Sequence, residues 1–165
     1  EAHEVLHVGT KAFGALAAEE LPETAWERVW VLSNLRGLVR GDAPVPPYKL
    51  KLAGLPGLKR HWQKAVPPLL AELPPGPVGA LLPLEHEAWL GGWDRPRHTA
   101  EIVDVQGRTI SHWSKLHRGR LARWILEHGE GDPKRVAKAR LEGATLEGLT
   151  PNASGGKTLR LVVNP

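Results

Sequence analysis

The sequence predicts an α+β or irregular α/β domain. Helical and extended patterns follow one another along the 165 residues without the regular strand–helix–strand rhythm of a parallel α/β fold. The apolar content of 41% and the charged content of 24% are those of a globular chain that can bury one core. The pieces on either side of Leu73–Pro77 are too small to fold alone. We therefore expect one domain over residues 1–165.

The first half of the chain predicts five elements. In order, they are a helix over Ala15–Val29 with a break at Leu21-Pro22, a buried strand over Val29–Ser33, a half-exposed strand over Tyr48–Leu52, a helix over Gly57–Ala65 and a further helical turn from Pro67 to Leu73. Pro22 suits a first helical position because its fixed φ is already helical. Tyr48–Leu52 alternates between polar and apolar residues, as a strand with one wet face does.

The second half predicts six more. They are a buried strand over Val78–Leu82, a short helix over Glu85–Leu90, a hairpin of 101–105 with 109–112, a helix to His128, a helix over Pro133–Leu141 and a strand over Thr158–Val163. Gly107 can supply the positive φ of the hairpin turn. Ser114 can cap the helix that Gly129 ends, and Asp132 can cap the next one.

Several classes of protein are excluded by composition. No apolar run approaches the roughly 20 residues that span a bilayer, and no signal peptide opens the chain, so we expect no membrane partner. The absence of cysteine excludes disulfides, iron–sulfur clusters and thiolate zinc sites. The absence of methionine indicates that Glu1 is not the natural start. Fifteen prolines, with cysteine and methionine missing, are typical of a thermophile.

Positive charge is concentrated in two blocks. Residues 36–64 hold seven Lys or Arg and one acid, and residues 107–140 hold nine and three, so each block carries +6. The remaining residues hold six bases and fourteen acids, or −8, which returns the net charge to +4. Two basic blocks on an acidic chain favour a polyanion partner, although Lys and Arg also simply solvate exposed helices.

The helix after Ile110 is amphipathic. One face should be core, and it gathers Trp113, Leu116, Leu121, Trp124 and Ile125. The opposite side gathers Lys115, Arg118, Gly119 and Ala122, with Arg123 at its border. The small residues could form a shallow floor on which a phosphate approaches the cations. They could equally let another element pack closely, and the residues alone leave both interpretations open.

Three motifs in one order resemble the YaaA-type peroxide stress protein family. VLSNLRGLVRGDAPVPPYKLKL at Val31–Leu52 resembles the family signature LSGLYGLLRPxDxxxPYRLEM, LLPLEH at Leu81–His86 resembles LASxEY, and ISHWSKLHRGRLARWI at Ile110–Ile125 resembles ISxYxKxARGxMARYI. Lys49 stands where the family has Arg, and Lys51 replaces a Glu. The family's opening segment and helix-hairpin-helix are missing, so we expect a divergent relative without the N-terminal third.

The resemblance implies a cytoplasmic protein of the oxidative stress response that limits iron-driven damage. It also implies a mixed sheet with surrounding helices in a single domain with a basic cleft, and duplex DNA as the partner. The residues that would bind DNA are Arg40, Lys49, Lys115, Arg118 and Arg123 on phosphates, with Tyr48 positioning one wall. The family motifs imply no reaction, so we expect no enzyme and no cofactor.

Two alternatives stay open. Glu85 could be an acid/base catalyst for a phosphorylated or nucleotide-like small molecule held by Lys115 and Arg118, or it could form a structural ion pair with them. The chain could also handle iron, although eight histidines show no metal-ligand spacing. No phosphate-binding loop and no nucleophile elbow are present. Trp89 and Trp93 could stack on bases or cover the border of a core.

Overall fold

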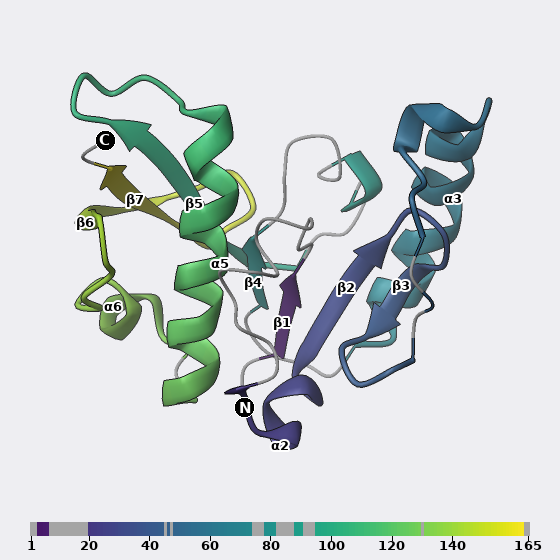
Figure 1. Ribbon diagram of the computed structural model, residues 1–165, viewed down its shortest axis with the longest axis horizontal. Helices are drawn as coiled ribbons and strands as arrows, with labels where there is room; N and C mark the ends of the chain where they lie inside the picture. The colour runs from purple at the N-terminus through teal and green to yellow at the C-terminus, as the bar shows by residue number, and fades with distance from the viewer. Residues whose placement is uncertain are drawn as a thin grey trace.

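A seven-stranded mixed sheet forms the centre of the protein, in the strand order β3-β2-β1-β4-β5-β7-β6 (Figure 1). The computed structural model describes residues 3–6, 20–44, 46, 48–73, 78–81, 88–90, 95–129 and 131–163. The strands are β1 His3–Leu6, β2 Val29–Ser33, β3 Gly37–Arg40, β4 Val78–Leu81, β5 Arg97–Asp104, β6 Ala144–Pro151 and β7 Lys157–Val163. The expected mixed sheet is confirmed.

Five adjacent strands are parallel, and the two outermost strands are antiparallel to them. β1 pairs with β2 on one side and with β4 on the other, β5 follows β4, and β7 follows β5. β3 and β6 close the sheet as antiparallel hairpin partners of β2 and β7. The chain therefore builds outward from β1 in one direction and from β4 in the other, which makes the β1–β4 boundary a topological switch point.

The helices are α2 Glu23–Trp26, α3 Leu58–Ala71, α5 Ser111–His128 and α6 Pro133–Val136, with 3-10 turns η2 Leu52–Gly54 and η3 Ala88–Leu90. α3 is one continuous helix through Pro67 and Pro68, so the expected division there is wrong. α5 ends where expected, because Gly129 adopts the left-handed conformation at φ 60°. None of the described helices has the length and apolar character that crossing a membrane requires.

Two hydrophobic cores lie on opposite faces of the sheet, as the alternation along β2 shows. Val29 and Val31 pack with α5, β5 and β7 in the larger core. Trp30 and Leu32 pack with α3 and η3 in the smaller one. Because successive strand residues point to opposite faces, α5 and α3 cover opposite sides, which Figure 1 shows with α5 in front of the sheet.

Several expected elements differ in the structure. Tyr48–Leu52 is not a strand, since the Leu50 carbonyl bonds to the Asn34 side chain and not to a neighbouring strand, and Leu52 belongs to η2. The second hairpin strand shrinks to one bridge, Val103 to Thr109, because α5 already begins at Ser111. Ser114 therefore lies inside α5 and does not cap it.

The N-terminal helix and the short helix before Leu90 are covered only in part by the described residues. Of the first, Glu23–Trp26 are helical and Val29 already belongs to β2, while residues 7–19 lie outside the described set. Of the second, only Ala88–Leu90 are described. β1, β3 and β6 were not among the expected strands.

The buried face of α5 is rotated from the expected one. Leu121 and Ile125 are buried as expected. Ala122 is only 1% exposed and Gly119 is buried, so the exposed shallow floor is wrong and the close-packing interpretation holds. His117 and Ser114 are buried too. The polar groups on the inner face explain why the hydrophobic pattern alone misplaced it.

Candidate functional site

Both basic blocks reach the edge at which the parallel strands end, here called the carboxyl edge. α5 starts there, because it follows the end of β5 after a short turn at residues 105–110. α3 also starts there, since its Trp62 Nε1 donates to the Asn34 carbonyl just after β2, at 3.0 Å. Ligands of open α/β sheets bind at this edge, next to the topological switch point.

The first wall of the site consists of Tyr48–Lys51 and the first turn of α3. Ser33 Oγ and the Tyr48 hydroxyl are hydrogen-bonded at 2.7 Å, and Asn34 Nδ2 donates to the Leu50 carbonyl at 2.9 Å. Ser33 Oγ also accepts from the backbone N–H groups of Leu35 and Arg36. These bonds fix the loop against the end of β2.

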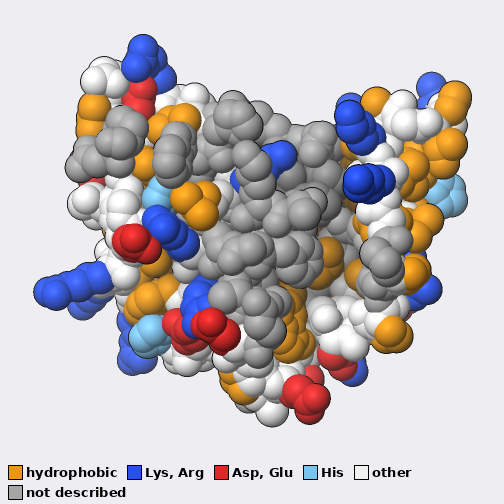
Figure 2. All heavy atoms as spheres, in the orientation of Figure 1, with side chains coloured by type: hydrophobic (Ala, Val, Ile, Leu, Met, Phe, Trp, Pro, Cys, Tyr) orange, Lys and Arg blue, Asp and Glu red, His pale blue; other side chains and the backbone are white. Residues whose placement is uncertain are grey.

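The first wall is basic. It carries the exposed side chains of Lys49, Lys51, Lys59 and Arg60. None of these four side chains forms an ion pair with a described acid. Figure 2 shows Lys and Arg side chains along the side of the α3 region that faces α5.

The second wall is the first half of α5. Lys115 is exposed, and it too has no acidic partner among the described residues. Arg118 is half-buried, on the same helical stripe as Ser114 and Ile125, and so points toward the sheet. In the sheet, β2 and β5 are three strand spacings apart, or about 14 Å.

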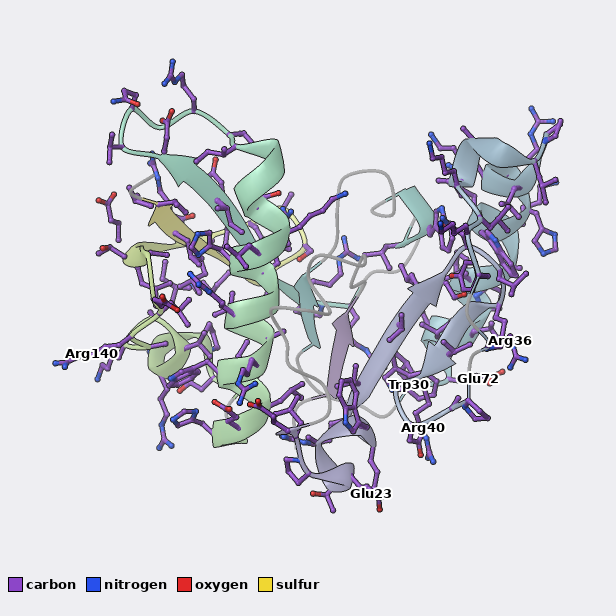
Figure 3. The ribbon with its side chains drawn as sticks, in the orientation of Figure 1. Glu23, Trp30, Arg36, Arg40, Glu72 and Arg140 are labelled. Atoms are coloured by element: carbon purple, nitrogen blue, oxygen red, sulfur yellow. The ribbon has the colours of Figure 1, made fainter. Side chains whose placement is uncertain are left out.

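Arg40 and Arg123 lie at the opposite edge. Arg40 is paired with Trp30 in the β2–β3 register, near the start of β2, and its Nε donates to the Asp42 carboxylate at 2.6 Å. This bond lowers the pKa of Asp42. Figure 3 shows Arg40 at the lower right border, pointing away from α5. The structure therefore does not bring Arg40 next to Lys49 or Lys115.

Arg123 is held by two acids. Its Nη2 lies 2.7 Å from Glu20 and its Nε lies 2.7 Å from Glu127, and the bond to Glu20 is the main cause that raises the pKa of Arg123. Arg123 sits eight residues after Lys115, or about 12 Å further along the helix axis. As a DNA contact it stays a prediction, as does Arg40.

Acidic side chains gather away from the carboxyl edge. Figure 2 shows them mainly toward the lower border of this face, where β2 begins. Of the described acids near the carboxyl edge, Asp104 is bonded to Arg108 at 2.8 Å and Glu142 to Arg120 at 3.0 Å. The negative charge of these two acids is thus already balanced by Arg108 and Arg120.

Of the other candidate residues, Glu85 and Trp93 lie outside the described residues. Trp89 has no exposed surface and belongs to the smaller core, so it does not stack on bases. Within the described part of the chain, no three acids or histidines converge to hold a metal ion.

Sequence reasoning missed the residues that hold the first wall. Ser33 and Asn34 belong to the family-like motif at Val31–Leu52, but the motif predicts no hydrogen-bonding role for them, and nothing in the sequence points to Trp62. The signal in the sequence was a hydroxyl residue at the end of a buried strand, followed by a turn and the Tyr-containing loop. The burial of Ser33, at 3% exposed, shows that it is an anchor.

The chain is similar in sequence to known proteins. The sequence model of the family described as peroxide stress protein YaaA matches residues 10–148. A UPF0246 protein of Variovorax paradoxus is 29% identical over 151 residues, which cover 79% of this chain and 58% of the relative. A UPF0246 protein of Corynebacterium glutamicum is 27% identical over 171 residues, which cover 92% and 65%. The chain thus spans less than two thirds of the length of these relatives.

Proposed function

Since the chain belongs to the YaaA family of peroxide stress proteins, we propose that it serves the peroxide stress response by binding duplex DNA at its carboxyl edge. The location would be the cytoplasm, and the benefit would be less iron-driven damage to the bound DNA. No reaction is needed for this role.

One observation carries the proposal. Lys49 and Lys51 on the first wall and Lys115 on the second are exposed, face the same edge and have no described acidic partner. Such cations neutralise phosphates and release condensed counterions, which is the main source of affinity in sequence-independent DNA binding.

The start of α3 supports the same partner. Its first turn contains Lys59 and Arg60 and no acid, and Gly57 gives no side-chain cap. Cations at the positive end of a helix dipole are unfavourable unless an anion lies nearby. Together with the positive end of the helix dipole, these cations suit a phosphate.

The proposal is tested by the affinity for a labelled duplex of about 20 base pairs at low salt. The triple variant K49Q/K51Q/K115Q should bind at least tenfold more weakly than the parent. The matched control, K134Q/K138Q/R140Q, loses the same charge from exposed positions on the α6 side and should bind within about twofold. Equal losses in the two variants would contradict a site at the carboxyl edge.

A second candidate function is an enzyme acting on a phosphorylated or nucleotide-like small molecule. The switch point between β1 and β4 favours it, because small ligands bind there in related architectures, and Glu85 follows β4 by four residues in the sequence. Calorimetry with nucleoside mono- and triphosphates tests it. Binding that persists in E85Q, with no turnover in the parent, would refute a catalytic Glu85.

A further inference from the structure

Tyr48 is exposed although its hydroxyl is bonded within the protein. Buried or half-buried tyrosines usually cover their apolar ring and leave the hydroxyl toward water. Here the hydroxyl bonds to Ser33, which is 3% exposed, while Tyr48 as a whole is 38% exposed. With the hydroxyl bonded to Ser33, the ring is the part of this side chain that is left to contact a ligand.

The ring is also held in a fixed orientation. The Ser33 bond fixes its tip, and the Asn34 bond to the Leu50 carbonyl fixes the backbone two residues later. Trp62 anchors Asn34 in turn through the Asn34 carbonyl. A side chain whose tip and neighbouring backbone are both hydrogen-bonded loses little conformational entropy when a flat group stacks on its ring.

The hydroxyl of Tyr48 lies on the same side of the sheet as α5. Val29 and Val31 of β2 pack in the core beneath α5, and strand alternation places Ser33 on that same face. The Tyr48 hydroxyl must reach this face to meet Ser33 Oγ. Lys49 directly follows the ring in sequence, and Lys51 stands two residues further, both exposed.

An exposed, fixed aromatic ring next to cations is the combination that single-strand binding proteins use. The cations follow the phosphate backbone, and the ring stacks on a base whose face is free. In duplex DNA the faces of the bases are covered by their neighbours, so the ring would contribute little there. We infer that Tyr48 is a base-stacking residue and that the carboxyl edge prefers single-stranded over duplex DNA.

This inference rests on the proposed binding of DNA at the carboxyl edge and adds which form of DNA that edge prefers. The test compares a fluorescein-labelled ten-nucleotide oligothymidylate with a labelled duplex, by anisotropy at about 50 mM salt. Y48A should bind the single strand about 5- to 150-fold more weakly and the duplex within about threefold. Y48F keeps the ring and should stay within about fivefold of the parent on both. L35A, which truncates an exposed apolar side chain in the neighbouring turn, is the matched control and should change neither affinity.

A second measurement needs no substitution. Tyr48 is the only tyrosine of the chain, so 3-fluorotyrosine incorporation gives one fluorine resonance that reports on this ring alone. The single strand should shift it at saturation, and the duplex should shift it much less. This measurement decides the question even if Y48A fails to fold.

The outcomes separate the two proposals. Duplex binding without single-strand binding, an equal loss on both DNAs in Y48A, or a fluorine resonance unmoved by saturating single strand would overturn the inference and leave the proposed function standing. Binding of neither DNA would overturn both.

Discussion

Gly37 offers the sharpest test of how the first wall is held. It ends the turn after β2 at φ +74°, and a Cβ built there would lie 2.6 Å from the ring of Trp62. Alanine would carry a left-handed backbone cost of about 1–2 kcal/mol and an overpacking cost of about 1–3 kcal/mol, or about 2–5 kcal/mol in all. Gly57 is the matched control, because its φ is +80° and nothing lies within 4 Å of its built Cβ. Gly57→Ala should therefore cost only the backbone part, about 1–2 kcal/mol.

Urea unfolding followed by tryptophan fluorescence measures both variants. The free energy of unfolding of Gly37→Ala should fall by about 1–3 kcal/mol more than that of Gly57→Ala. In thermal unfolding, the same difference lowers the midpoint temperature by about 2–12 °C more. Adding Trp62→Leu to Gly37→Ala should recover part of that excess, since the clash requires the ring. Equal losses for the two glycines would show that Trp62 does not pack against the turn, and would remove the support for a rigid Tyr48 wall.

Three further predictions concern groups away from the first wall. Burial lowers the pKa of His117 below its ordinary 6.5, so the unfolded chain binds a proton more readily than the folded chain does. The free energy of unfolding should therefore be highest above pH 6.5 and fall as the pH drops. In urea unfolding, H117L should flatten this pH dependence between about pH 5 and pH 7. Asn152→Ala should cost about 1–3 kcal/mol in the same assay, because its amide donates to the Arg97 carbonyl and its oxygen accepts from Gly156 N, whereas Asn152→Asp keeps the acceptor and should lose less. Arg120→Gln should destabilise by at most about 1 kcal/mol at low salt and by less at high salt, since Glu142 is exposed; a loss independent of salt would assign the effect to the bond with the Glu142 carbonyl.

The sequence predicted those elements whose own residues determine them. Val29–Ser33 has the β-branched, apolar composition of a buried strand and forms β2 at the expected bounds. Gly129 and Asp132 mark a helix end and a helix start by local backbone chemistry, and both do so in the structure. The closing strand was also found, one residue longer at its start.

The failures concern elements that depend on partners distant in sequence. β3 lies in a turn-rich segment and becomes a strand because it pairs with the outer side of β2. Tyr48–Leu50 has the alternation of a strand but no neighbouring strand, so side chains bond its backbone instead. Period and propensity cannot indicate which edge is vacant.

The predicted DNA-binding residues do not all lie at one edge of the sheet. Lys49, Tyr48, Lys115 and Arg118 lie at the carboxyl edge, and their role in binding DNA stays a prediction. Arg40 belongs to the same block as Lys49, yet β3 runs antiparallel to β2 and carries it to the other edge. Charge along the sequence therefore cannot separate the two ends of a hairpin.

The salt dependence of duplex binding tests the central claim most directly. Each phosphate contact contributes about 0.9 to the slope of log K against log salt concentration. If Lys49, Lys51 and Lys115 contact phosphates, K49Q/K51Q/K115Q should lower the magnitude of that slope by about 2.7, and K134Q/K138Q/R140Q should leave it within about 0.5. An unchanged slope in the first variant, or an equal fall in both, would contradict a DNA site at the carboxyl edge.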